Sequence, residues 1–104
     1  MTLEMLDVSE ESIKAFCIRW KITELALFGS VLWDDFGPNS DIDVLATFAP
    51  DSQRTLLDEA QMEIELEEIF ARKVDLLSRS AVERSPNWVR REEILGTAVS
   101  VYAR

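Results

Sequence analysis

LALFGS at residues 25–30 and DIDVLATF at residues 41–48 are the segments that decide the fold of this chain of 104 residues. The apolar run before Gly29 is typical of a buried strand that ends abruptly at a turn. The second segment predicts another strand. Asp41 and Asp43 share one face of it, because side chains alternate along a strand. We therefore expect two core strands joined by a loop, with a small-residue turn on one side and paired acids on the other.

The turn and the acid pair each suit one part of a nucleotide. Gly29 allows close approach to backbone amides, and the Ser30 hydroxyl can cap the turn and donate to a phosphate oxygen. Asp41 and Asp43 repel each other unless a cation lies between them, and their hard oxygen ligands favour Mg²⁺. Each motif alone is more often an ordinary turn or a solvated strand end. At this spacing they together predict a nucleotide-transfer site.

Asp75 is a third candidate ligand. It is the only acid in the strand-like run KVDLL at residues 73–77. If this strand lies beside that of Asp41 and Asp43, facing side chains are about 5 Å apart. Three carboxylates at that separation can bind two metal ions roughly 4 Å apart. An ordinary strand-end acid is the alternative, and the upstream pair favours the ligand.

Apolar periodicity and capping residues predict three helices, over residues 9–20, residues 52–70, and from residue 85 towards residue 102. The residues expected to face the core are Ile13, Phe16, Cys17 and Trp20 in the first helix and Leu56, Leu57, Ala60 and Ile64 in the second. Strands are predicted at residues 24–28, 42–48 and 74–77. This order indicates one α+β domain over residues 1–104, a two-layer sandwich with a small mixed sheet packed against helices.

Composition narrows the classes of partner and chemistry. The net charge of −9 repels polyanions, so we expect no direct contact with nucleic acid and instead a basic protein partner. No apolar run approaches the ~18 residues of a membrane span, and the acidic N-terminus suits a cytoplasmic protein. Histidine is absent, which excludes acid–base catalysis and metal binding by an imidazole side chain. The single Cys17 cannot form an internal disulfide and is expected to be a buried thiol.

LFGS at residues 27–30, SDID at residues 40–43 and VDL at residues 74–76 resemble the minimal nucleotidyltransferases (MNT) of the DNA polymerase β-like superfamily. The resemblance covers nearly the whole chain. It implies a nucleotidyltransferase fold and an antitoxin encoded beside a HEPN-domain ribonuclease toxin. Such antitoxins silence the toxin by moving AMP from ATP onto its tyrosine hydroxyl. A hetero-oligomer with the toxin is therefore implied, and a homodimer stays open.

The same resemblance implies a role for each motif residue. Gly29, Ser30 and Ser40 bind the nucleotide. Two Mg²⁺ ions are held by Asp41, Asp43 and Asp75, and Asp75 is also a candidate to take the proton of the attacking hydroxyl.

One departure from the family pattern concerns positive charge. Many members carry arginines at the positions of Trp33 and Gly37, and residues 22–53 contain no Lys or Arg. The leaving pyrophosphate then has to be neutralised by Mg²⁺, backbone amides and distant bases such as Arg72 or Lys73, or by a cation of the partner. Two alternatives follow: a degenerate transferase that neutralises its partner by occlusion alone, and transfer to a small molecule such as an aminoglycoside.

Overall fold

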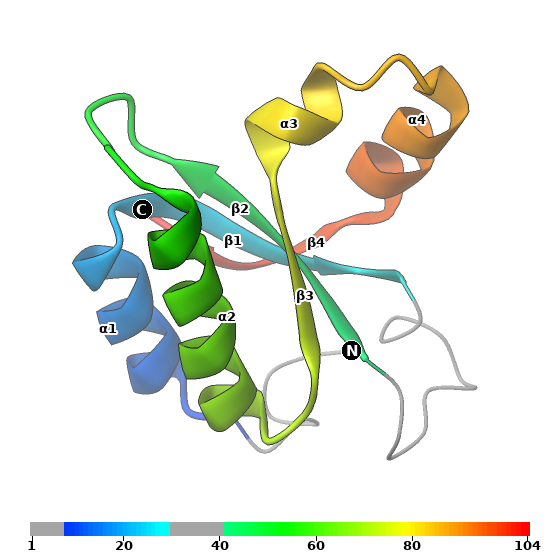
Figure 1. Ribbon diagram of the computed structural model, residues 1–104. Helices are drawn as coiled ribbons and strands as arrows, with labels where there is room; N and C mark the ends of the chain where they lie inside the picture. The colour runs from blue at the N-terminus through cyan, green and yellow to red at the C-terminus, as the bar shows by residue number, and fades with distance from the viewer. Residues whose placement is uncertain (1–7, 30–40) are drawn as a thin grey trace.

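The computed structural model describes residues 8–29 and 41–104. Four strands form one sheet in the order β3-β2-β1-β4, namely β1 (Ile22–Phe28), β2 (Ile42–Phe48), β3 (Val74–Ser78) and β4 (Val99–Ala103). β1 pairs antiparallel with both β2 and β4, whereas β2 and β3 are parallel (Figure 1). The sheet is therefore mixed, and the predicted α+β fold class is confirmed.

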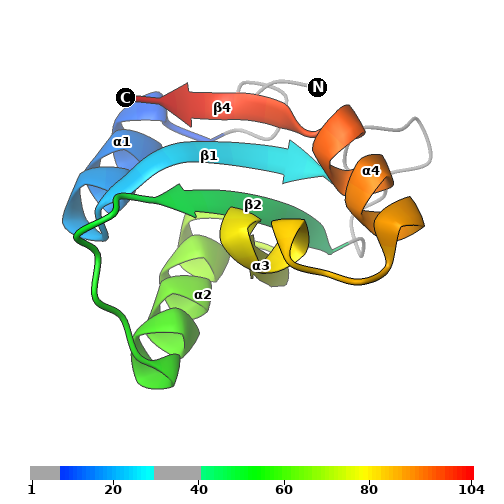
Figure 2. The ribbon, with the colours of Figure 1, turned by 90° about the horizontal axis from the view of Figure 1, so that it is seen from above.

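Helices cover both faces of this sheet, so the predicted two-layer arrangement is wrong and the part of the chain that is described has three layers. They are α1 (Glu10–Arg19), α2 (Leu56–Phe70), α3 (Arg79–Glu83) and α4 (Trp88–Thr97). α1 and α2 contribute to the larger buried cluster on one face, while α3 and α4 pack on a smaller cluster on the other. Figure 2 shows α4 at the end of the sheet where β1 ends. No helix in the described ranges is both long and apolar enough to cross a membrane.

Alternation along β1 divides its side chains between the two clusters. Leu25 and Leu27 face the larger cluster, whereas Ala26 and Phe28 face the smaller one. The predicted stripe of α1 also lies in the larger cluster: Ile13, Phe16 and Cys17 are buried, and Trp20 is partly buried against it. Both faces of β1 are thus covered, as expected for a central strand made of a continuous apolar run.

The inward face predicted for α2 is wrong. Leu56 and Leu57 are 84% and 82% exposed, and Ile64 is also exposed, while the buried residues of the helix are Met62, Leu66 and Phe70. The helix begins after Thr55 and not at Ser52, because Thr55 and Asp58 form a reciprocal capping box. Two apolar stripes with the same four-residue spacing compete on this helix, and the sheet buries the stripe formed by Met62, Leu66 and Phe70.

The last predicted helix is also corrected. It was expected to run from Ser85 towards Tyr102, but α4 starts after its N-cap Asn87 and ends at Thr97. The residues that follow form β4, which pairs with the otherwise open edge of β1. Alternating Val99 and Val101 suit such a strand, because β-branched side chains fit a pleated surface. The short helix α3 was not predicted.

Candidate functional site

Asp43 lies near the start of β2, on the face of the sheet that carries α3 and α4. Its neighbours Ile42 and Val44 belong to the larger cluster, so alternation turns Asp43 to the opposite face. In the register of the sheet, Asp43 faces Phe28 of β1 on one side and Asp75 of β3 on the other. The strand pairing therefore brings two of the predicted acids together from distant parts of the chain.

Gly29 lies directly against Asp43. Its φ angle is +78°, a backbone conformation that L side chains rarely adopt. A Cβ atom at this position would collide with the Asp43 carboxylate. Both the dihedral angle and the close approach thus require glycine. Gly29 of the predicted turn and Asp43 of the predicted acid pair meet at this contact. The other two predicted nucleotide ligands, Ser30 and Ser40, lie outside the described residues. So do Trp33 and Gly37.

The charges of Asp41 and Asp75 both act on Asp43, and these three acids are called the acid cluster. Burial raises the pKa of Asp43 above its ordinary value, and the charges of Asp75 and then Asp41 raise it further. The positive charge of Arg90 acts in the opposite direction. Asp41 and Asp75 are exposed, whereas Asp43 is half-buried. Asp43 is therefore the centre of the cluster, and its charge is the least well solvated of the three.

The donor chemistry of this cluster fits Mg²⁺. All candidate ligand atoms are carboxylate oxygens, and a divalent cation would relieve the crowding of like charges around Asp43. In the described part of the chain, no three acidic, His or Cys side chains are gathered closely enough to form a ready-made metal site. Mg²⁺ is commonly held by one or two carboxylates together with substrate phosphates, which suits an open cluster of this kind. The metal-binding roles of Asp41, Asp43 and Asp75 stay predictions.

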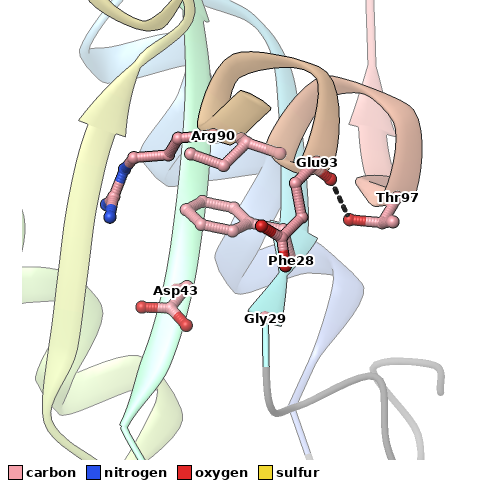
Figure 3. Close-up of a pocket in the computed structure, with 7 residues that line it drawn as sticks. Phe28, Gly29, Asp43, Arg90, Glu93 and Thr97 are labelled. Atoms are coloured by element: carbon pink, nitrogen blue, oxygen red, sulfur yellow. Dashed lines mark hydrogen bonds between the residues drawn. The ribbon is translucent and has the colours of Figure 1, made fainter. Parts of the chain in front are cut away.

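A pocket of about 350 Å³ opens beside the cluster, between the sheet and α4. Its lining residues are Phe28, Gly29, Asp43, Arg90, Glu93, Ile94 and Thr97. Figure 3 shows Arg90 and Glu93 reaching from the same helix into the region above Asp43 and Gly29. The Thr97 hydroxyl donates to the Glu93 carbonyl oxygen at 2.6 Å, which occupies it within the helix. The pocket lining thus includes a glycine without a side chain, two acidic residues and one arginine.

Arg90 is one of the pocket residues that the sequence did not reveal. It is the one base among the described residues that line this pocket, while the distant bases proposed from the sequence, Arg72 and Lys73, do not line it. No local pattern distinguishes Arg90 from the neighbouring Arg91. The difference lies in the contacts of the two side chains: Arg91 donates to the Ser85 carbonyl oxygen at 3.2 Å, while Arg90 lines the pocket.

Comparisons with known proteins agree with this geometry. The family model described as the nucleotidyltransferase domain matches residues 9–100. The chain is 30% identical over 84 residues to a Methanocaldococcus jannaschii protein provisionally named a protein adenylyltransferase, covering 81% of this chain and 84% of that protein.

Solved structures show the same fold. One, provisionally described as a minimal nucleotidyltransferase, has a TM-score of 0.70 and 32% identity, covering 95% of each chain. Another holds a tri-AMPylated HEPN toxin of Shewanella oneidensis in complex with an MNT antitoxin. Its matching chain has a TM-score of 0.60 and 20% identity, covering 91% of this chain and 70% of that one.

Proposed function

Because the chain belongs to the nucleotidyltransferase family, we propose that it is an antitoxin that transfers AMP from ATP to a tyrosine hydroxyl of a HEPN toxin in a Mg²⁺-dependent reaction. The name of the M. jannaschii relative supports a protein as the acceptor, and the toxin–antitoxin structure of similar fold supports a HEPN partner. Modification of the toxin would neutralise it. We place the protein in the cytoplasm, as one domain acting in a hetero-oligomer with its toxin.

The contact between Gly29 and the acid cluster carries this proposal. Gly29 lines the pocket without a side chain, and Asp43 lies against it with Asp41 and Asp75 within electrostatic range. In the reaction, the tyrosine oxygen forms a bond to the α-phosphorus while the bond from that phosphorus to the bridging oxygen breaks. Pyrophosphate leaves with the electron pair. When bound, Mg²⁺ would neutralise charge on the phosphates, and Asp41, Asp43 and Asp75 are the residues to hold it.

Asp75 is the proposed acceptor of the tyrosine proton. Its side chain is exposed at the start of β3, beside Asp43 in the sheet register. It is therefore open to a hydroxyl group that approaches from a partner. A carboxylate within hydrogen-bond reach of the attacking oxygen can take this proton as the new bond forms.

The surface around the pocket suits a protein acceptor. Trp88 and Val89, at the start of α4, are 64% and 56% exposed. They lie on the helix that supplies Arg90 and Glu93 to the pocket wall. Exposed aromatic and aliphatic side chains are typical anchors of protein interfaces. A toxin docked there would place its tyrosine close to the acid cluster.

The test is a transfer assay with the purified protein, ATP, Mg²⁺ and the HEPN protein encoded by the neighbouring gene. We expect the HEPN protein to gain the mass of one or more AMP groups. Asp41→Asn and Asp43→Asn should each lower the rate at least about a hundredfold, because each removes a carboxylate that would hold the metal beside the phosphates. Asp51→Asn is the matched control, since Asp51 is exposed and pairs with Lys21 near the other end of β2. Full transfer by both site variants would refute the proposed metal role.

Occlusion without chemistry is the second candidate. The absence of Lys and Arg from residues 22–53 favours it, because phosphoryl transfer depends on neutralised charge. The discriminating measurement is toxin suppression in cells that carry Asp43→Asn. Occlusion predicts continued suppression with no mass added to the toxin, whereas transfer predicts that growth is lost.

A further inference from the structure

Residues 22–53, which contain the LFGS and SDID motifs, include no Lys or Arg, and Arg90 of α4 brings a positive charge to the pocket. Arg90 lines the pocket together with Gly29 and Asp43, and Figure 3 shows its guanidinium above and to the left of the Asp43 carboxylate. The residue is exposed to solvent, so its charge is available to a ligand that enters the pocket. The helix holds it there, because the Asn87 side chain caps α4 by accepting from the Arg90 backbone N–H at 3.1 Å.

The guanidinium of Arg90 has donors to spare. Within residues 8–29 and 41–104, it forms none of the ion pairs that engage Arg19, Arg54 and Arg79. An arginine carries five N–H donors in a planar fork that matches phosphate oxygens. Among the described residues, its guanidinium interacts electrostatically with Asp43. An arginine that served only to hold the fold together would be expected to use its donors on nearby carbonyl or carboxylate groups, as Arg91 does.

The charge of the pocket also favours a role for Arg90 in binding a negatively charged ligand. A nucleoside triphosphate brings several negative charges to a wall that already holds Asp43 and Glu93. Entry of such a ligand requires positive charge within the same pocket. Arg90 is the residue on the described lining that provides it. Divalent cations at the carboxylates and a guanidinium on the helix would then neutralise the phosphate chain from two directions.

We propose that Arg90 binds the non-bridging oxygens of the β- and γ-phosphates and stabilises the pyrophosphate as it leaves. This inference rests on the proposed nucleotidyl transfer and adds a residue to it. The bonds made and broken are those given above, and Arg90 exchanges no proton. Its contribution is to neutralise the negative charge that develops on the bridging oxygen when the bond from the α-phosphorus breaks. A helix residue outside the motif thereby replaces the arginines of other family members.

The experiment measures binding of ATP, ADP and AMP to the full chain by calorimetry with Mg²⁺ present. Arg90→Ala should weaken ATP binding about tenfold or more, since a charge-assisted hydrogen bond is worth at least that factor, and should change AMP binding less than about twofold. Arg90→Lys should recover part of the ATP affinity. Arg104→Ala removes the same charge, and its backbone N–H donates to Thr23 near the other end of β1, about 20 Å from Gly29. It should bind all three nucleotides as the unchanged protein does.

The outcomes separate this inference from the function on which it rests. Unchanged ATP affinity in Arg90→Ala overturns the role of Arg90, and so does an equal loss for ATP and AMP, which would indicate damage to the pocket. Nucleotide binding that depends on Arg90, in a protein that never modifies its HEPN partner, overturns the proposed function and supports the phosphate contact. A protein that binds no nucleotide at all overturns both. Thermal unfolding checks that each variant is folded.

Discussion

Gly29 is the residue whose replacement tests the site most directly. Its positive φ angle and its contact with Asp43 make any side chain unfavourable, so Gly29→Ala should lower the free energy of unfolding by about 1–3 kcal/mol and abolish transfer. Urea unfolding and the transfer assay measure the two effects. Gly96→Ala is the matched control, because a Cβ there meets nothing within 4 Å. It lies within α4, where alanine should stabilise the protein by about 0.5–1 kcal/mol. A Gly29→Ala variant with normal stability would contradict the observed geometry.

Individual residues of the site differed in how far the sequence could place them. Asp41 and Asp43 follow from the period of a strand, and Gly29 from the abrupt end of an apolar run, because these are local rules. Asp75 needed the additional assumption that its strand lies beside that of the pair, which the register now shows. Arg90 could not be found, since nothing near it in the sequence indicates that α4 covers the end of β1.

At the level of elements, the start of α2 can be tested by mutation, because the sequence suggested Ser52 as the first residue whereas the structure has Thr55 as the N-cap. The Thr55 hydroxyl accepts from the Asp58 N–H at 3.2 Å, and the Asp58 carboxylate accepts from the Thr55 N–H at 3.0 Å. Thr55→Ala should therefore cost about 1 kcal/mol in the free energy of unfolding. Ser52→Ala, at the start expected from the sequence, should change it by less than about 0.5 kcal/mol. Urea unfolding of the two variants compares them, and the reverse order would place the cap at Ser52.

The sequence predicted the helices and strands whose signals are local. The prediction failed where contact with another element determines the structure. β1, β2 and β3 are apolar runs bounded by polar residues or turns, so they were found nearly to their ends. β4 exists because the edge of β1 is open to it, and that edge is not visible in residues 99–103 themselves. The inward face of α2 failed for a related reason. Leu56 and Met62 are both apolar, and only the position of the sheet decides which of them is buried.

At the scale of the whole molecule, Cys17 links stability to alkaline pH. It is fully buried, and burial raises the pKa of its thiol from 9.0 to about 12. Between these values the unfolded chain loses the thiol proton while the folded chain keeps it. Unfolding therefore becomes easier as pH rises, by up to about 1.4 kcal/mol per pH unit for one proton. Below pH 9 this group contributes no pH dependence.

The measurement is the free energy of unfolding at several pH values above and below 9, for the protein and for Cys17→Ala. The alanine variant loses packing at every pH but also loses the titrating thiol. Its deficit should therefore shrink as pH rises, because other titrating groups are common to both proteins. A deficit that stays constant from pH 8 to pH 11 would show that the thiol ionises equally well in the folded state.

The parallel pairing of β2 and β3 has a consequence for when the protein can act. Two parallel neighbours cannot be joined by a tight hairpin, so the chain passes through α2 before Asp75 reaches the side of Asp43. Such long-range pairing forms late, after the intervening segment has been laid down. A nascent or clipped chain that lacks β3 has only part of the acid cluster, whatever its remaining shape. A complete acid cluster therefore requires that synthesis has passed β3 and that β3 has paired with β2.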